Sequence, residues 1–360
     1  MTSTPEQSAT SPWEHVGPGT PGGRLLRSAW QPVSRSCDVV SGVPVRIEIL
    51  AQHFTLYRGQ SGRAALLADR CPHRATMLSV GMVDGDDLRC HHHGWRFAPS
   101  GTCVARPGDE TGIHARCHAR SYPVQEYLGL VFAWLGDGDA PPLPRHPEYE
   151  LPGVLRVLPV DAWPCTFFQR LENSCDFWHL ESAHALSGVG AIMRGELALT
   201  TVEHPDGMTV EATVGGRPLA PVRFSLPNLL EFQTPVSERV GWRNHLVWRV
   251  PIDDGRCASF VVTLVPADVP DAASYRLDAP IRMPFAPTET ARLGEEVLAG
   301  RVTLGSLSSR SLTEVEDYVA LVGQGSAGDR AHEALGRLDA PVVALRRRWR
   351  RAVAEAGLLP

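Results

Sequence analysis

Hydrophobic and polar positions alternate over short stretches in the first part of the chain, which predicts β-strands separated by turns. The strand-like segments within residues 43–136 are "VPVRIEIL", "FTLYR", "AALLADR", "GWRFAPSG" and "VQEYLGLVFAWLG", and the turn "GQSG" separates the second from the third. Short apolar runs bounded by Gly, Pro and Ser are typical of strands. We therefore predict a small all-β domain in this region.

The pattern changes after residues 136–153, which are rich in Pro and Gly and mark a domain boundary. "TFFQRLENSCDFWHLESAHAL" has the apolar recurrence of one helix, and the strand-like runs "LALTTVE", "MTVEATV", "HLVWRVPID" and "ASFVVTLV" follow it. Three further segments, the longest being "AHEALGRLDAPVVALRRRWRRAVAEAG", return to a helical pattern. We predict an α+β fold, with an N-terminal segment over 1–35, the β domain over 36–145, and a larger domain over 146–360 with helices on an antiparallel sheet.

Composition and charge exclude several classes of function. The 360 residues carry a net charge of -5, so no global positive field attracts nucleic acid or an anionic membrane. The sequence contains no Lys, which removes Walker-type phosphate loops and pyridoxal Schiff bases. The start lacks a basic and apolar signal, and the longest apolar stretch, "LGLVFAWLG", is half a membrane span, so we expect a cytoplasmic protein. The basic run "RRRWRR" is interpreted as a solvated helix end.

Two cysteines and two histidines stand at metal-ligand spacing between residues 71 and 95. Cys71 and His73 form one pair, Cys90 and His93 form a second pair, and sixteen residues separate the two pairs. Two thiolates and two imidazoles could surround one zinc ion or be shared between two irons, and spacing alone leaves both open. Glycines near both pairs favour turns, so each pair is expected at a hairpin tip.

The stretch "CPHRATMLSVGMVDGDDLRCHHHGW" resembles the cluster-binding motif of Rieske proteins. This resemblance implies that Cys71 and Cys90 bind one iron of a [2Fe-2S] cluster while His73 and His93 bind the other. Neutral imidazoles in place of thiolates raise the reduction potential of such clusters. The extra cysteine pair of respiratory Rieske proteins is missing, which favours the oxygenase branch.

A second candidate metal site lies in "ENSCDFWHLESAH". His179 and His184 are five residues apart, about 140° around an ideal helix, so they can share a metal only if the helix distorts or ends between them. Taken alone, two helical histidines are more often packed or solvated than ligating. Asp176, three residues before His179, can reach that ring and fix its tautomer.

The same stretch is similar to the mononuclear-iron motif of Rieske oxygenases, with Asn173 three positions before Asp176. The resemblance implies that His179 and His184 bind Fe(II) with Asp317 from a C-terminal helix, on a face that leaves positions open for O2. The alternative is that Asp317 and its acidic neighbours only favour a helix start. The resemblance also implies that Asp176 bridges His179 to His93 of a neighbouring subunit, in a homotrimer, and that the larger domain has the helix-grip fold of START-like domains.

The function implied by this resemblance is that of a terminal oxygenase of the phthalate-dioxygenase-like branch. It would hydroxylate, demethylate or dihydroxylate an aromatic or polycyclic small molecule. No credible nucleotide motif occurs, so NAD(P)H would act through a separate reductase, with or without a ferredoxin. The alternatives are a Rieske electron carrier with an inert second domain and a zinc-binding interaction protein. Candidate substrate contacts on the sheet are Phe224, Asn228, Asn244, His245 and Trp248.

Overall fold

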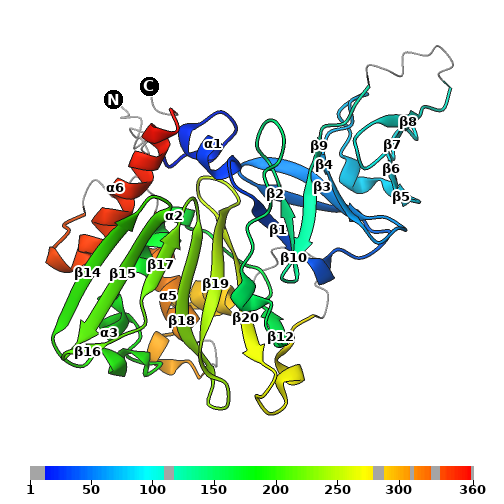
Figure 1. Ribbon diagram of the computed structural model, residues 1–360. Helices are drawn as coiled ribbons and strands as arrows, with labels where there is room; N and C mark the ends of the chain where they lie inside the picture. Colours follow the sequence, from blue (N-terminus) through cyan, green and yellow to red (C-terminus); the bar gives the residue numbers. More distant parts are fainter. Residues whose placement is uncertain (1–12, 109–116, 279–287, 309–311, 326–332, 358–360) are drawn as a thin grey trace. The chain divides into compact units, whose positions relative to one another are not determined.

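The computed structural model describes residues 13–108, 117–278, 288–308, 312–325 and 333–357 (Figure 1). The chain divides into two compact units, one formed by Arg27–Val160 and Val262–Pro284, the other by Met1–Leu26, Asp161–Val261 and Phe285–Pro360. The predicted division at residues 35 and 145 stays a prediction. The predicted α+β class is confirmed: strand pairs such as β12 (Gly153–Val157) with β20 (Cys257–Pro266) and β18 (Leu229–Ser237) with β19 (Gly241–Pro251) are antiparallel, and helices are grouped along the chain rather than alternating with the strands of the larger sheet.

The first unit holds three small sheets, with strand orders β1-β11-β10, β2-β3-β4-β9 and β5-β6-β7-β8. "VQEYLGLVFAWLG" forms a hairpin rather than one segment, because Leu128 and Gly129 both take positive φ and turn the chain between two strands. The strands are β1 (Gln31–Arg35), β2 (Val45–Ile49), β3 (Gln52–Arg58), β4 (Ala64–Ala68), β5 (Met82–Asp84), β6 (Asp87–Arg89), β7 (Arg96–Phe97), β8 (Cys103–Ala105), β9 (Ser121–Tyr122), β10 (Val124–Tyr127) and β11 (Leu130–Ala133).

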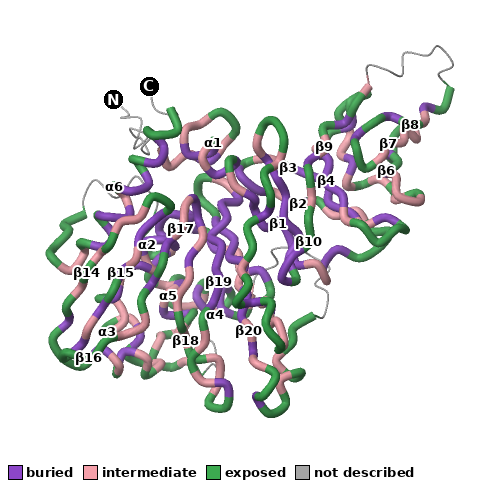
Figure 2. Tube along the Cα trace, viewed as in Figure 1, coloured by how far each residue is buried: buried purple, intermediate pink, exposed green. Residues whose placement is uncertain are grey.

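A nine-stranded sheet is formed by strands that follow residue 152, with the order β12-β20-β19-β18-β17-β15-β14, to which β13 and β16 add. Its central strands β19 and β20 are buried along most of their length (Figure 2). The strands are β12 (Gly153–Val157), β13 (Asp161–Trp163), β14 (Leu197–His204), β15 (Gly207–Val214), β16 (Arg217–Pro218), β17 (Val222–Ser225), β18 (Leu229–Ser237), β19 (Gly241–Pro251) and β20 (Cys257–Pro266).

Helices cover this sheet. Helix α2 contacts β17 and β19, α6 contacts β14 and β15, and α2 packs against α5 and α6. The helices are α1 (Pro21–Arg27), α2 (Phe167–Cys175), α3 (His179–Ala183), α4 (Glu289–Leu298), α5 (Leu312–Gly323) and α6 (Ala340–Glu355). Aromatic rings of Phe167, Phe168 and Trp349 pack edge to face between α2 and α6. This contact fixes the helix that leads into the second predicted site.

The predicted solvated helix end holds only for part of "RRRWRR": Arg347, Arg350 and Arg351 are exposed, whereas Arg346 and Arg348 are not. Arg348 is 4% exposed, and Arg346 lies 2.7 Å from Glu172 of α2. Arg347 lies 2.5 Å from Glu203 of β14. These ion pairs connect α6 to α2 and to the sheet, so the run serves the packing of the domain.

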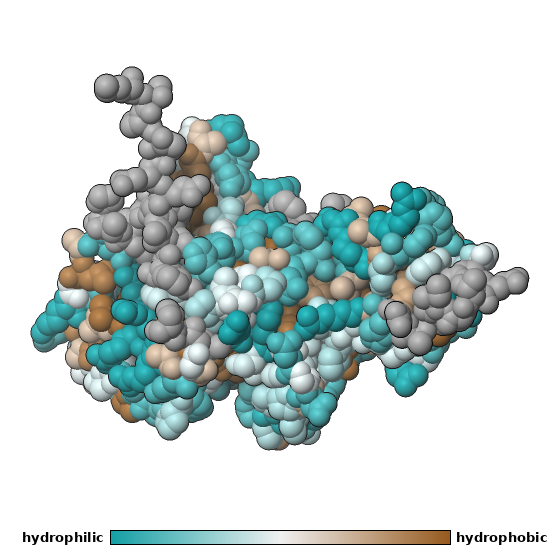
Figure 3. All heavy atoms as spheres, turned by 90° about the horizontal axis from the view of Figure 1, so that it is seen from above, coloured by the Kyte–Doolittle hydropathy of each residue, from teal (hydrophilic) through white to brown (hydrophobic). Residues whose placement is uncertain are grey.

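Among the described residues, no helix has the length and apolar content needed to cross a membrane. The face shown in Figure 3 is mainly hydrophilic, with apolar side chains in small groups.

Candidate active site

The two predicted cluster loops are built alike. In the first, the amide of Cys71 donates to the carbonyl of Thr76 at 2.9 Å; in the second, the amide of Cys90 donates to that of Trp95 at 2.7 Å. Both loops turn at a residue with positive φ four positions after the cysteine, Ala75 and Gly94. The two cysteines and their histidines therefore sit in matching turns.

The side chains of these loops fit a [2Fe-2S] cluster. Cys71 and Cys90 are each 3% exposed, and the rings of His73 and His93 lie 4.6 Å apart at the surface. Burial raises the pKa of Cys71 to about 11. The adjacent Cys90 thiol also raises this pKa, whereas backbone hydrogen bonds lower it. Two neighbouring buried thiolates need a compensating positive charge, which bound iron provides.

Aromatic contacts support the two imidazoles. Trp95 stacks on His73 with ring centroids 4.3 Å apart, and His92 stacks on His93 at 3.8 Å. The Nδ1 atom of His92 is 3.1 Å from the hydroxyl of Thr76 and connects the two loops. This contact joins the two predicted cluster loops through side chains other than the predicted ligands.

The second site lies where α2, α3 and α5 meet. The predicted single helix is broken: α2 ends at Cys175, and Asp176 takes an extended backbone conformation. Helix α3 then begins at His179 and ends at Ala183, which leaves His184 beyond its last turn. The helix therefore ends between the two histidines, as their five-residue spacing requires if both are to bind one metal.

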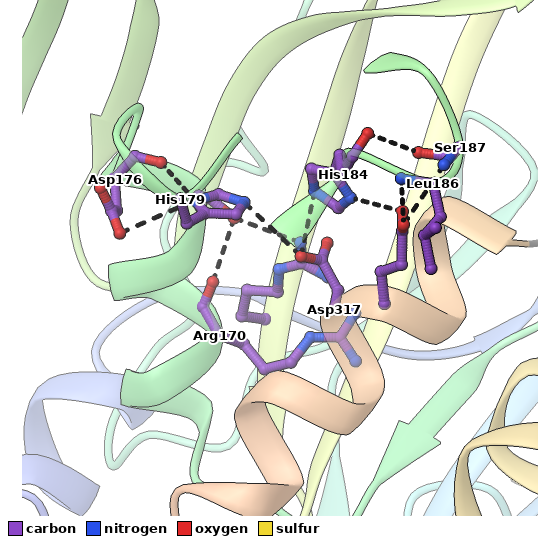
Figure 4. A network of polar contacts seen from close by, with 10 residues as sticks. Arg170, Asp176, His179, His184, Leu186, Ser187 and Asp317 are labelled. Carbon is purple, nitrogen blue, oxygen red and sulfur yellow. Dashed lines mark hydrogen bonds and ion pairs between the residues drawn. The ribbon is translucent and has the colours of Figure 1, made fainter. Parts of the chain in front are cut away.

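His179, His184 and Asp317 come together in the structure, with one ligand atom of each within 4.8 Å of the others (Figure 4). Asp317 Oδ1 is 3.5 Å from His179 Nε2 and 3.3 Å from His184 Nε2. Burial alone would raise the pKa of Asp317, but the two histidine side chains that face its carboxylate outweigh burial and hold the pKa well below its usual range. Asp317 Oδ1 is buried without a conventional hydrogen-bond partner, as a metal ligand would be.

Both histidines hold their Nδ1 protons away from Asp317. His179 Nδ1 donates to the backbone carbonyl of Asp176 at 2.5 Å, whereas the Asp176 carboxylate is 3.7 Å away. The carbonyl rather than the predicted carboxylate therefore fixes this tautomer. The carboxylate accepts a hydrogen bond from the amide of Trp178 at 2.8 Å. The backbone carbonyl of Asn173 accepts from the amide of Asp176 at the end of α2.

Glu316 is the residue that the sequence analysis missed. Its Oε2 accepts from His184 Nδ1 at 3.2 Å, and its Oε1 accepts from the amides of Leu186 and Ser187 at 3.1 and 3.2 Å. Its side chain is 1% exposed. The Nε2 atoms of both histidines are thus free of protons and face one carboxylate, a 2-His-1-carboxylate arrangement that would suit Fe(II).

Comparisons with known proteins agree with this geometry. The Rieske [2Fe-2S] domain family matches residues 29–127. The chain is 30% identical over 357 residues to the 5,5'-dehydrodivanillate O-demethylase oxygenase subunit of Sphingobium sp. (strain NBRC 103272 / SYK-6), covering 93% of this chain and 77% of that protein. This chain belongs to the Rieske oxygenase family.

A second relative of this Rieske oxygenase is the phthalate 4,5-dioxygenase oxygenase subunit of Pseudomonas putida, 26% identical over 91% of this chain and 81% of that protein. Among solved structures, dicamba monooxygenase bound to dicamba superposes with a TM-score of 0.66 at 17% identity, over 93% of this chain and 100% of that one. The oxygenase in a ferredoxin complex of carbazole 1,9a-dioxygenase gives 0.65 at 22% identity, over 89% and 88%. These structures share the fold. The predicted enzyme class, a Rieske-type oxygenase rather than a pure electron carrier, is confirmed.

The candidate substrate contacts of the oxygenase lie in different environments. Asn228 is 1% exposed, and its side-chain amide donates to the carbonyl of Arg249 at 3.0 Å. Asn244 is exposed. His245 is 5% exposed, and its Nε2 lies 2.7 Å from the hydroxyl of Thr234. Phe224 and Trp248 are buried.

Proposed function

We propose that this Rieske oxygenase demethylates a methoxylated aromatic small molecule, taking electrons from a separate NAD(P)H-dependent reductase or a ferredoxin. The relative named as an O-demethylase subunit, which matches 93% of this chain, supports this choice of first reaction. Ring hydroxylation and dihydroxylation are the other reactions to test, because dioxygenase subunits are also among the relatives. The observation that carries the proposal is the convergence of His179, His184 and Asp317 on one point.

These three residues would hold Fe(II), and Cys71, Cys90, His73 and His93 would hold the [2Fe-2S] cluster. Iron bound by the triad would offer open positions for O2, and the cluster would deliver electrons one at a time. The residues around the triad keep both histidines in the tautomer that presents Nε2. The carboxylate of Asp317 is already ionised, so it needs no proton removed before it binds a cation.

Asp176 is proposed to join two subunits of a homotrimer. Its amide and one carboxylate oxygen are used within the turn, and its other carboxylate oxygen is directed toward the His179 ring. Beside it Trp178 is 45% exposed, and Leu186 nearer the triad is 55% exposed. A second copy that covers these apolar side chains would place His93 of the partner subunit against Asp176. Sedimentation analysis tests the trimer, and a monomer at micromolar concentration would contradict it.

His245 is the best placed of the proposed substrate contacts. Arg249 of the same strand donates to Ser174 of α2, so it points toward the helices. Residues four apart on a strand share a face, so His245 points the same way, toward the side where the triad lies. Asn228 is occupied by the backbone and Asn244 lies on the opposite face. We propose His245 and Thr234 as a polar pair that orients the substrate.

The test is oxygen uptake with a heterologous reductase across aryl methyl ethers, aromatic acids and polycyclic compounds, followed by product mass. Formaldehyde released in step with oxygen uptake supports demethylation, and a product that gains two hydroxyls supports dioxygenation. The Asp317→Ala variant is the control, because it removes a proposed ligand while leaving the Rieske loops untouched. Product formation that persists in this variant would contradict the proposal.

A further inference from the structure

Two cysteines outside both proposed metal sites lie opposite one another in the Rieske domain. Thr102 and His118 form an antiparallel bridge, and the amide of Ala119 donates to the carbonyl of Gly101 at 2.9 Å. In an antiparallel pair, each step forward on one strand matches a step back on the other. The next pair in this register is Cys103 and Cys117, whose side chains therefore leave the same face.

The spacing of such a pair suits a disulfide. Directly opposed residues beside a non-hydrogen-bonded pair have Cα atoms about 5.5 Å apart, within the range of about 4.4–6.8 Å that a disulfide spans. Cys103 is buried and belongs to the same apolar cluster as Cys71 and Cys90, against which the half-buried Cys117 packs. Burial first and then the nearby Cys117 thiol raise the pKa of Cys103, which agrees with their proximity.

The two thiols differ in their access to solvent. Cys103 is 6% exposed, and its thiol donates to the carbonyl of Ala105. Cys117 is more exposed, so an oxidant in solution reaches it first. When a second thiol lies next to an oxidised cysteine, it can form a disulfide with that cysteine before the cysteine is oxidised further.

We propose that Cys103 and Cys117 are a redox-active pair that forms a reversible disulfide when hydrogen peroxide is present. The Cys117 thiol attacks hydrogen peroxide, which breaks the O–O bond and gives a sulfenic acid and one water. The Cys103 thiol then attacks the sulfenic sulfur, so that the S–S bond forms and a second water leaves. In total two thiols lose two electrons and two protons, and one peroxide becomes two waters. A dithiol reductant reverses the change.

The bond would connect β8 to the segment that precedes β9. One residue after β8, Arg106 lies over the ring of Trp95 at 5.3 Å, and Trp95 stacks on His73. A disulfide between Cys103 and Cys117 would therefore restrain β8, the strand that leads directly to Arg106. Formation of the disulfide itself does not depend on the proposed oxygenase reaction.

The test uses cluster-loaded full-length protein and a peroxide dose below the one that bleaches the visible absorbance of the cluster. Free thiols are alkylated, and the digest is searched for a peptide pair joined through Cys103 and Cys117. We expect this cross-link in most molecules and its loss after treatment with dithiothreitol. Cys165 and Cys257, both nearly fully buried, are the internal controls and should stay reduced.

A Cys103→Ala variant distinguishes disulfide formation by the pair from oxidation of Cys117 alone. In this variant Cys117 should carry a sulfenic acid that a dimedone probe traps, with no cross-link. Absence of the Cys103–Cys117 peptide pair in the wild-type protein would overturn the proposal. So would an equal yield of Cys165–Cys257 cross-link, since the oxidation would then not be selective.

Discussion

Replacing Glu316 by Gln tests how the structure sets the tautomer of His184. The amide oxygen of Gln can keep both hydrogen bonds from the amides of Leu186 and Ser187, which converge on one oxygen of Glu316. Its NH2 group then faces His184 Nδ1, where Glu316 accepts at 3.2 Å. An NH2 group can only donate, so it favours the tautomer with the proton on Nε2 and occupies the nitrogen that would bind iron.

The expected size follows from the role of such supporting partners. Their loss typically lowers metal affinity about 10–100-fold, or roughly 1.4–2.8 kcal/mol of binding free energy. The unfolding free energy should fall by only about 1 kcal/mol, because the two amide hydrogen bonds persist. Glu316→Leu would remove the acceptor of both part-buried amides and should cost more, about 1–3 kcal/mol of stability. The Gln variant therefore isolates the effect on the metal site.

The assay is an anaerobic Fe(II) titration of protein stripped of mononuclear iron, in competition with a chromophoric chelator. The visible absorbance of the cluster reports that the Rieske domain is intact. Glu314→Gln, an exposed change two residues away on the same helix, is the matched control and should bind Fe(II) like the wild type. Equal Fe(II) affinity in Glu316→Gln and the wild type would refute the reasoning.

Three further predictions concern other groups. His179→Ala should abolish turnover and retain the visible spectrum of the cluster; a spectrum lost together with turnover would contradict two separate sites. Asp176→Asn keeps an oxygen for the amide of Trp178 but removes the charge, so both metals should stay bound while turnover falls about 10–100-fold, as metal analysis and oxygen uptake would show. Burial raises the pKa of the Cys175 and Cys257 thiols from 9.0 to about 12, so their contribution to stability is present below pH 9.0 and is lost as the pH rises toward 12. Chemical denaturation of Cys257→Ala and wild type across this range should show a smaller decline in the variant, and equal slopes would oppose this assignment.

The loops of the proposed cluster site could be predicted because their residues are close in sequence. The four predicted ligands lie in two turns of a small β domain, and short-range backbone hydrogen bonds close both turns. These residues are Cys71, His73, Cys90 and His93. The prediction of the α+β class rested on periodicity, which follows directly from burial on one face of each element.

Contacts between distant segments were not predictable in the same way. The apolar periodicity of the sequence continues through Asp176, so it does not indicate the break between α2 and α3. Such periodicity reports which side chains are buried and not the backbone angles. Glu316 resembled an ordinary acid at a helix start, because its partners lie about 130 residues earlier in the chain. Arg346 and Arg348 resembled a solvated run for the same reason, since their partners lie on α2 and at the end of β14.

The most direct test of two unlike iron centres in one chain is a count of iron and acid-labile sulfide in protein purified without oxygen. The account predicts about three irons and two sulfides per chain in the wild type, and about two irons and two sulfides in Asp317→Ala. A ratio of one iron to one sulfide in the wild type, unchanged by the substitution, would contradict it.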